Sequence, residues 1–242
     1  MRIVSKTDVG QVRRSNQDAY ATGELPGGVA WAVVCDGMGG ANGGNVASAM
    51  AVKVISGQIS ASYRDGMSSN SIRTMLESAI TAANISVYDL SREREDLSGM
   101  GTTVVACVIT NGVAHIAHAG DSRAYKFTTE KITQITRDHT YVQSLVEDGK
   151  LTSEEAKTYP HRNIITRALG VNERLVVDYN EIGLDEDEAI LMCTDGLTGN
   201  LEPEDMLDVF KSCQFYEYPD MLVQLANNRG GNDNITVVIL SL

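Results

Sequence analysis

Trp31-Ala32-Val33-Val34-Cys35-Asp36-Gly37-Met38-Gly39-Gly40 is an apolar run that ends in one carboxylate and a glycine-rich turn. A continuous apolar run bounded by turn residues is typical of a strand in a sheet core. The sequence therefore predicts a buried strand that presents Asp36 at its end.

Four more aspartates follow or precede short apolar runs, namely Asp18, Asp121, Asp195 and Asp233. Carboxylates held together at strand ends would repel each other unless a cation neutralised them. Carboxylate oxygens are ligands of hard cations such as Mg²⁺ and Mn²⁺, and glycines let a backbone carbonyl approach as well. We therefore expect a hard-metal site, although a single Asp-Gly, taken alone, is more typical of a structural turn.

An arginine stands close to the first of these aspartates, in the stretch Gly10-Gln11-Val12-Arg13-Arg14-Ser15-Asn16-Gln17-Asp18. A guanidinium group binds phosphate oxygens in a planar fork, so Arg13 beside a metal-bound carboxylate would suit a phosphate substrate. The alternative for this stretch is an exposed basic loop. A Walker A phosphate loop is not the explanation of the glycines near Asp36, because Gly-Lys followed by Ser or Thr is absent there.

The four histidines do not read as a metal set. His115 and His118 are three apart in an expected strand, so their side chains should lie on opposite faces. His139 follows another expected strand, and we expect it to orient a loop. The four cysteines include no CxxC pair, which argues against a zinc-thiolate site.

The amino-acid composition and net charge argue against several classes of protein. The chain has 242 residues, 43% of them hydrophobic, and a net charge of -12. This charge, without a Lys/Arg cluster, argues against a nucleic-acid partner. No apolar run approaches the roughly 18 residues needed to cross a bilayer, and the first residues lack the apolar region of a secretory signal. We expect a monomeric protein of a reducing compartment, the cytoplasm, without a membrane partner.

Most of the predicted elements are strands, and the predicted helices come in pairs between groups of strands. The expected strands are 2–7, 29–35, 102–110, 113–118, 124–128, 132–136, 175–181, 188–193 and 235–240. Asn111-Gly112 predicts a type I′ hairpin and therefore antiparallel pairing. Apolar residues at helical spacing predict helices over about 43–63, 72–90, 203–210 and 219–227. Sheets covered by helix pairs in one continuous domain, an α+β fold, fit this order best.

The segment from Tyr141 to Gly170 is short and irregular in its pattern. Residues 141–148 read as one short helix, and Thr152-Ser153-Glu154-Glu155 is a capping box that would open another. Two interpretations remain open from the residues alone. One is a mobile flap beside the site, and the other is a packed helical connection.

Taken in order, the motifs resemble those of a bacterial protein serine/threonine phosphatase of the metal-dependent PPM (PP2C) family. The resemblance runs from Gly10 to Asn234 and covers nearly the whole chain. Its motifs are Arg-x-x-Asn-Gln-Asp, Asp-Gly-Met-Gly-Gly, Gly-Thr-Thr at 101–103, Gly-Asp-Ser-Arg, Asp-His-Thr, Thr-Asp-Gly-Leu and Asp-Asn-Ile-Thr.

The resemblance implies a four-layer α/β/β/α sandwich over residues 1–242, with two packed antiparallel sheets and a flap at about 141–170. It implies two core Mn²⁺ or Mg²⁺ ions and a third, weaker ion. The roles it carries over are a bridging carboxylate at Asp36, a carbonyl ligand at Gly37, further ligands at Asp195 and Asp233, support from Asp18, the third ion at Asp121, and phosphate binding at Arg13.

The implied reaction is hydrolysis of phosphoserine and phosphothreonine by a metal-bridging hydroxide, in opposition to a Ser/Thr kinase. The chain departs from the better-known eukaryotic pattern at Met38, where a histidine is thought to protonate the leaving oxygen. Methionine donates no proton, so we expect a metal-bound water near Asp121 to do so.

Two other function classes remain to be weighed. A catalytically silent binding module would have no need of all five aspartates, so their presence argues against it. A metal-dependent hydrolase of small phosphate esters or nucleotides would use the same site, and only a comparison of substrates separates it from a protein phosphatase.

Overall fold

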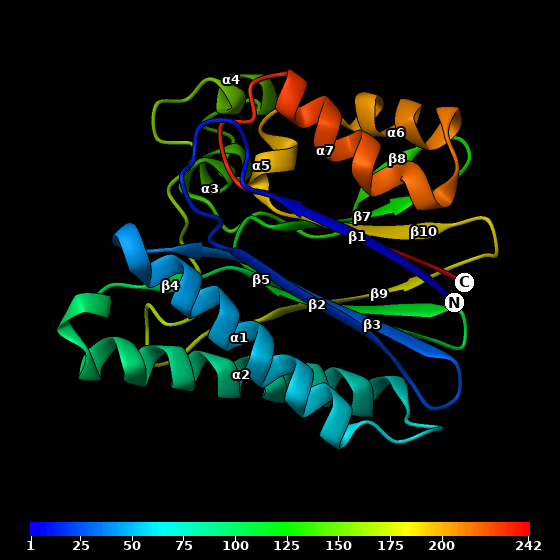
Figure 1. The fold of residues 1–242 in the computed structure, drawn as a ribbon, viewed down its shortest axis with the longest axis horizontal. Helices are drawn as coiled ribbons and strands as arrows, with labels where there is room; N and C mark the ends of the chain where they lie inside the picture. The colour runs from blue at the N-terminus through cyan, green and yellow to red at the C-terminus, as the bar shows by residue number, and fades with distance from the viewer.

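The computed structural model, which describes residues 1–40 and 43–242, contains two antiparallel sheets packed face to face (Figure 1). In chain order the strands are β1 (Arg2–Asp8), β2 (Asp18–Leu25), β3 (Val29–Met38), β4 (Gly101–Thr102), β5 (Val104–Thr110), β6 (Val113–Ala119), β7 (Arg123–Phe127), β8 (Ile132–Gln134), β9 (Asp178–Gly183), β10 (Ala189–Cys193) and β11 (Ile235–Ser241). One sheet has the order β1-β11-β10-β7-β8. The other has the order β2-β3-β5-β6-β9, with β4 paired to the end of β3.

Helix pairs cover the outer face of each sheet. The helices are α1 (Gly40–Ser62), α2 (Ser69–Glu93), α3 (Tyr141–Glu147), α4 (Ser153–Lys157), α5 (Asp195–Thr198), α6 (Pro203–Ser212) and α7 (Tyr218–Asn228), with 3₁₀ turns η1 (Glu95–Leu97) and η2 (Phe215–Glu217). Figure 1 shows α1 and α2 below the sandwich and α6 and α7 above it. The layer order is therefore α/β/β/α, and the predicted α+β sandwich is confirmed. Among the described helices, none is both long and apolar enough to cross a membrane.

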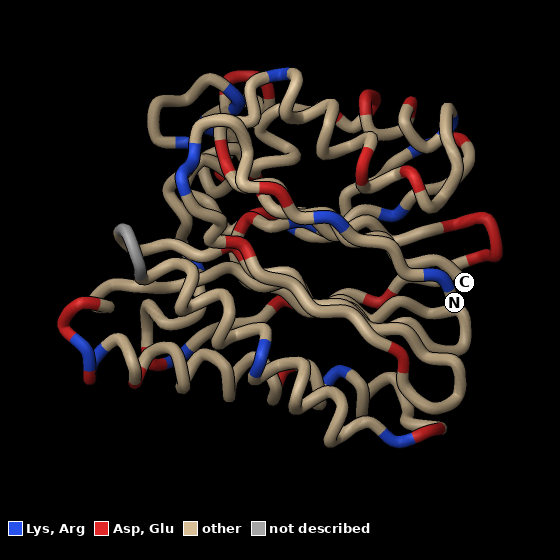
Figure 2. Tube along the Cα trace, in the orientation of Figure 1, with Lys and Arg blue, Asp and Glu red and all other residues tan. Residues whose placement is uncertain are grey.

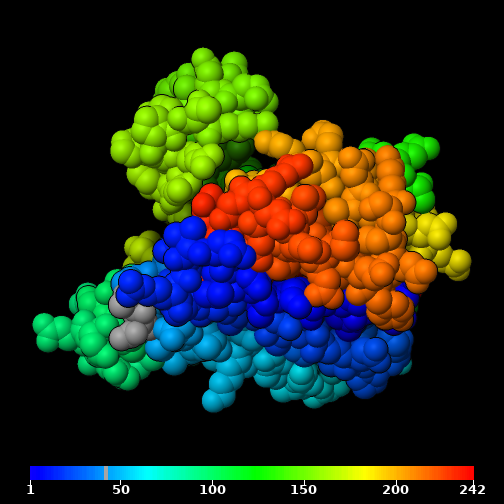
Figure 3. Space-filling model, turned by 45° about the horizontal axis from the view of Figure 1, so that its top comes forward, coloured from blue at the N-terminus to red at the C-terminus, as the bar shows by residue number. Residues whose placement is uncertain are grey.

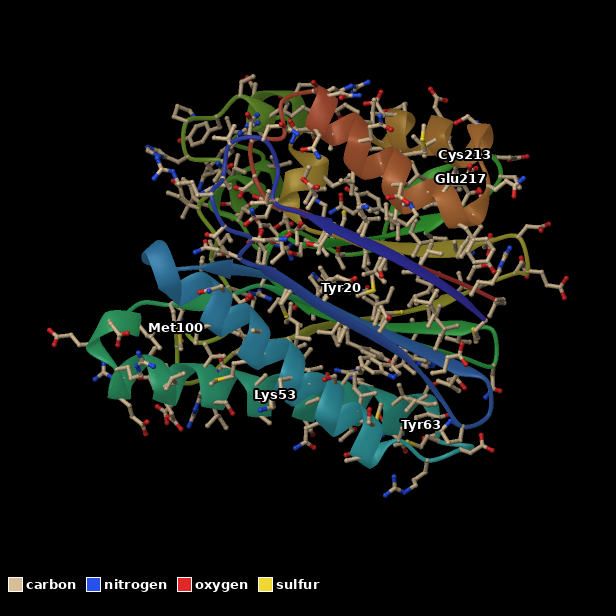
Figure 4. The ribbon with its side chains drawn as sticks, in the orientation of Figure 1. Tyr20, Lys53, Tyr63, Met100, Cys213 and Glu217 are labelled. Atoms are coloured by element: carbon tan, nitrogen blue, oxygen red, sulfur yellow. The ribbon has the colours of Figure 1, made fainter. Side chains whose placement is uncertain are left out.

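Three apolar layers hold this arrangement together. The middle layer lies between the sheets and contains fully buried side chains of both, including Val34, Ile116, Ile190 and Val238. Figure 4 labels Tyr20 between the sheets, where it packs against this layer. The outer layers join α1 and α2 to one sheet and α6 and α7 to the other. Each sheet is thus buried on both faces, which explains why its central strands are apolar throughout.

Most predicted elements are present, although the predicted strands 132–136 and 175–181 are observed as Ile132–Gln134 and Asp178–Gly183, and two larger corrections follow. The predicted strand 102–110 is broken at Thr103, because its N–H donates to the Asp36 carbonyl (2.9 Å) instead of continuing a strand ladder. Strand β2 was not predicted, since Asp18–Leu25 has few β-branched residues and contains Gly23. That glycine has a packing reason: a Cβ there would lie 2.8 Å from the ring of Trp31 on β3.

Two local predictions are confirmed in detail. Asn111 and Gly112 both have positive φ, 51° and 71°, as a type I′ hairpin between β5 and β6 requires. Thr152 accepts a hydrogen bond from the Glu155 N–H, and Glu155 accepts one from the Thr152 N–H, so the capping box opens α4.

The 141–170 segment forms a lobe at one end of the molecule. Figure 3 shows it in light green, projecting from the sandwich. Its two ends meet, because the Tyr141 N–H donates to the Ile164 carbonyl (2.8 Å) and Thr140 pairs with Ile165. Helix α4 buries no side chain. The lobe is therefore anchored at its base and exposed over much of its outer part.

Replacing Ile190 by alanine tests the middle apolar layer. Ile190 is fully buried between the sheets, so Ile190→Ala should lower the free energy of unfolding by about 2–5 kcal/mol. Urea denaturation measures this change. The control is Ile85→Ala on α2, where the side chain is 48% exposed and the change should stay within about 1 kcal/mol. Equal losses in both variants would contradict the proposed core.

Candidate active site

The pairing of the strands brings the five aspartates to one end of the sandwich. Asp18 on β2 faces Asp36 on β3 in the antiparallel register. Next to the other sheet, Asp195 is the first residue of α5, with only Thr194 between it and the end of β10, and Asp233 lies just before β11. Asp121 lies in the turn between β6 and β7. Two strands of one sheet, the turn that joins the two sheets and two segments beside β10 and β11 thus contribute one carboxylate each.

Asp36 is held by the Gly-Thr-Thr segment that follows η1. Its N–H donates to Thr103 Oγ1 (2.9 Å), and its carbonyl accepts hydrogen bonds from the Thr103 N–H (2.9 Å) and from Thr102 Oγ1 (2.8 Å). The break between β4 and β5 therefore helps to hold Asp36 in place. It directs backbone and side-chain groups of Thr103 toward Asp36.

Close backbone contacts explain two of the glycines beside the aspartates. A Cβ at Gly37 would lie 2.0 Å from the Gly44 carbonyl oxygen, in the first turns of α1. A Cβ at Gly196 would lie 2.0 Å from the Asn234 carbonyl oxygen. Any side chain at either position would push apart segments that carry the carboxylates.

Several carboxylate oxygens are buried without a donor. Asp18 Oδ2 accepts hydrogen bonds from Thr194 Oγ1 (2.9 Å) and Thr236 Oγ1 (2.6 Å). In contrast, the Oδ1 atoms of Asp18, Asp121 and Asp195 have no hydrogen-bond partner among the described residues. Buried polar atoms nearly always have a partner. Oxygen atoms of this kind, crowded at one place, fit the ligand set of a hard divalent cation.

Burial, and after it the neighbouring carboxylates, raise the pKa values of four of the aspartates. Burial raises the pKa of Asp18 to about 7, with further contributions from Asp195 and Asp233. Burial and the charge of Asp195 likewise raise the pKa of Asp121 to about 7. Burial and neighbouring aspartates also raise the pKa values of Asp36 and Asp195. In the absence of a cation, the site therefore favours protonated carboxyl groups.

Asn234 holds the arginine loop against the site. Its amide donates to the carbonyls of Val9 (2.9 Å) and Ser15 (3.0 Å), and its Oδ1 accepts from the Gln17 N–H (2.8 Å). Arg13, between these anchors, donates from Nη2 to Asp233 Oδ2 (2.7 Å). The Arg13 side chain is 53% exposed, so it has room to turn toward a ligand.

Two adjoining cavities open over the aspartates. The first, about 730 Å³, is lined by Arg13, Asp36, Gly37, Met38, Asn163, Asp195 and Asp233, among others. The second, about 660 Å³, is lined by Asp121 and shares Asn163, Asp195 and Asp233 with the first. Asn163 belongs to the 141–170 lobe, so the lobe forms part of both walls.

The structure brings together every site residue that the sequence pointed to. Arg13, Asp36, Gly37, Asp195 and Asp233 line one cavity, Asp121 lines the next, and Asp18 lies half-buried on β2 opposite Asp36. Among the residues that hold these groups or line the cavities, Thr194, Thr236, Asn234 and Asn163 were not predicted to have a role. The first three stand inside or beside the recognised motifs, whereas no pattern in the sequence distinguishes Asn163.

Comparisons with known proteins place the chain in a family. The protein phosphatase 2C family profile matches residues 10–234. The serine/threonine phosphatase stp of Listeria monocytogenes serotype 4b is 35% identical over 244 residues, which cover 99% of this chain and 95% of the relative. The structure of the S. agalactiae serine/threonine phosphatase has 35% identity and a TM-score of 0.92, covering 98% of both chains. The chain belongs to the protein phosphatase 2C family.

A further solved structure is relevant to the site. The catalytic domain of PstP, described in complex with two manganese ions, has 31% identity and a TM-score of 0.85, covering 98% of this chain and 96% of that one. The family assignment confirms the resemblance seen in the motifs. It also confirms that the chain is an enzyme of the protein serine/threonine phosphatase class.

The raised pKa values predict how the metal-free protein responds to pH. Asp18 and Asp121 have a pKa of about 7 in the fold, against about 3.9 in an unfolded chain. Between these values the folded state binds more protons, so stability is full at low pH and is lost as pH rises toward 7. In EDTA, Tm should fall as pH rises from about 5 to 8, and Asp18→Asn should flatten that slope.

The control for this measurement is Asp89→Asn, an exposed position on α2. It should leave the slope as in the unsubstituted protein. Saturating Mn²⁺ should remove most of the decline, because a cation favours the charged carboxylates. A pH slope that is the same with and without Asp18 would show that the crowded carboxylates do not govern stability.

Proposed function

We propose that this phosphatase hydrolyses phosphoserine and phosphothreonine on proteins with divalent cations, Mn²⁺ or Mg²⁺, held by the five aspartates. The observation that carries the proposal is the set of buried carboxylate oxygens without donors around two adjoining cavities. The manganese-bound PstP relative supports the choice of metal.

We assign the ligands as follows. Asp36, the Gly37 carbonyl, Asp195 and Asp233 would hold two core ions, with Asp18 supporting them from the buried side. Asp121, together with Asp195, would hold a third and weaker ion. When bound, such ions lower the pKa of water and so supply hydroxide at neutral pH.

Arg13 is the residue proposed to bind the substrate phosphate. Its guanidinium lies 2.7 Å from Asp233 Oδ2 and is half exposed at the cavity wall. Asp233 raises the pKa of Arg13, so the group stays cationic. A guanidinium directed into the cavity would bind two phosphate oxygens and offset the negative charge that builds up on them during transfer.

The leaving oxygen needs a proton that no side chain supplies from the expected position. Met38 lines the cavity there and has no proton to give. Among the described residues that line the two cavities, none is a histidine. We propose that water on the Asp121 side of the cavity protonates the leaving serine or threonine oxygen.

The setting of the enzyme belongs to the same proposal. The substrates would be phosphorylated proteins, and a Ser/Thr kinase would oppose the enzyme in the cytoplasm. We propose that residues 1–242 act as one monomeric catalytic domain with a flap at about 141–170. Lys and Arg are scattered among more numerous acidic residues (Figure 2), which fits a protein without a nucleic-acid partner.

Phosphate release from a phosphothreonine peptide is the decisive assay. With Mn²⁺ we expect turnover that EDTA abolishes and that Asp36→Asn lowers roughly 100-fold or more, because a central charge of the site is lost. Asp89→Asn is the matched control and should retain full activity. Nucleotides and small phosphate esters are tested beside the peptide at equal Mn²⁺. Faster turnover of those compounds would replace the protein phosphatase proposal, and no turnover by folded, Mn²⁺-loaded protein would refute it.

Asp121→Asn tests the source of the proton. A serine or threonine oxygen needs a proton to leave, whereas nitrophenolate leaves without one. The variant should therefore lower kcat for the phosphopeptide by roughly 100-fold and affect p-nitrophenyl phosphate much less. Equal losses on both substrates would argue against a proton-supplying role on the Asp121 side.

A further inference from the structure

Asp138 and His139 form hydrogen bonds with both ends of the turn that carries Asp121. At one end, the His139 N–H donates to the Gly120 carbonyl (2.9 Å), and the Gly120 N–H donates to His139 Nδ1 (3.1 Å). At the other end, Arg123 donates from Nε and Nη2 to the Asp138 carboxylate (2.6–3.0 Å). The Gly120–Arg123 turn is thus fixed on both sides of Asp121.

The His139 ring is held in one tautomer. Because Nδ1 accepts the Gly120 N–H, the ring proton is on Nε2, from which it is donated to Asp178 Oδ2 (3.1 Å). Arg167 Nη1 donates to the other Asp178 oxygen (2.8 Å). His139 is 4% exposed, so water does not compete for these contacts. Asp178 and Arg167 therefore fix the orientation of the ring that binds Gly120.

A metal ion is a poor explanation of this cluster. One ligand-type atom from each of His118, His139 and Asp178 lies within 4.8 Å of the others. However, the Nε2 of His139 bears its proton, and the Arg167 guanidinium lies 3.1 Å from that atom and 2.8 Å from Asp178. The Arg167 guanidinium therefore already provides the positive charge beside the Asp178 carboxylate. The cluster is better suited to holding structure than to binding metal.

The same turn is joined to Asp36. Ser122 Oγ lies 2.7 Å from Thr103 Oγ1, which accepts the Asp36 N–H (2.9 Å). Gly120, at φ 117°, packs its Cα against Thr103, where an added Cβ would lie 2.7 Å from the threonine side chain. The position of Asp121 relative to Asp36 therefore depends on this short chain of contacts.

The cluster also reaches the end of the 141–170 lobe. The Thr166 N–H donates to the His139 carbonyl (2.8 Å), and Arg167 follows directly. Asp178 opens β9 on the far side of this segment. His139 is thus connected to the Asp121 turn, to the lobe and to the second sheet.

We propose that His139, oriented by Asp178 and Arg167, is a positioning residue that sets the place of the Asp121 carboxylate and ties the base of the lobe to it. The inference rests on the proposed function, in which Asp121 holds the weakest ion. It makes a prediction about metal affinity and backbone protection that does not depend on turnover.

A Mn²⁺ binding isotherm on the whole protein tests this inference, with Asp121→Asn identifying the step that depends on Asp121. His139→Ala should weaken that step by roughly 10–100-fold, as loss of supporting groups does at metal sites, and leave tighter steps within about threefold. It should also speed hydrogen exchange at the Gly120 amide, which loses its acceptor. The matched control is His115→Ala, which removes an equally buried imidazole that bonds Tyr179 instead.

A milder variant guards against a folding defect. Arg167 is about one-third exposed, and Arg167→Met keeps its apolar stem while releasing Asp178. It should move both readouts in the same direction by a smaller amount, whereas Arg94→Met, at an exposed ion pair with Asp96 after the end of α2, should move neither. Wild-type metal binding and Gly120 exchange in both His139→Ala and Arg167→Met would overturn the inference.

One outcome separates this inference from the proposed function. If Asp121→Asn binds Mn²⁺ as the unsubstituted protein does, the metal role of Asp121 is wrong. Hydrogen exchange at the Gly120 amide then becomes the only test of the positioning role. Faster exchange in His139→Ala still supports the positioning of the turn, and unchanged exchange refutes it.

Discussion

Mutual repulsion among carboxylates crowded at one end of the sandwich is the constraint on which the rest of the site depends. Burial and neighbouring charges raise the pKa values of Asp18, Asp36, Asp121 and Asp195 together. A flexible chain would move these groups apart. Here the strand ladders and the apolar layer between the sheets hold them in place, so stability of the core is used to keep a high charge density where a cation can bind.

Within this framework, hydrogen bonds from polar side chains hold individual site residues in position. Thr103 binds the backbone of Asp36, two threonines bind one oxygen of Asp18, and Asn234 holds the loop of Arg13. The proposed role of His139 extends the same arrangement to Asp121. These neutral or paired groups hold the backbone or one oxygen of a carboxylate, while one oxygen each of Asp18, Asp121 and Asp195 is left without a hydrogen-bond partner among the described residues.

The sequence allowed most of the fold and the main site residues to be predicted, because apolar runs, Asn-Gly and helical spacing are local signals. Strand β2 escaped prediction because it lacks such a signal and depends on pairing with β3. Thr103 was placed inside a strand for a related reason. Its hydrogen bonds go to Asp36, a residue 67 positions away, and no local pattern reveals them.

The residue types set the available chemistry before folding: five aspartates at the ends of apolar runs, an arginine beside the first, and a methionine where a proton donor is expected. The folded chain shows what the residue types do not: these groups meet at two adjoining cavities, Asn163 of the lobe lines both, and His139 faces Gly120 rather than a metal. The physical reason is that residue type sets what a side chain can bind. Which groups it reaches depends on strand register and sheet packing between distant parts of the chain.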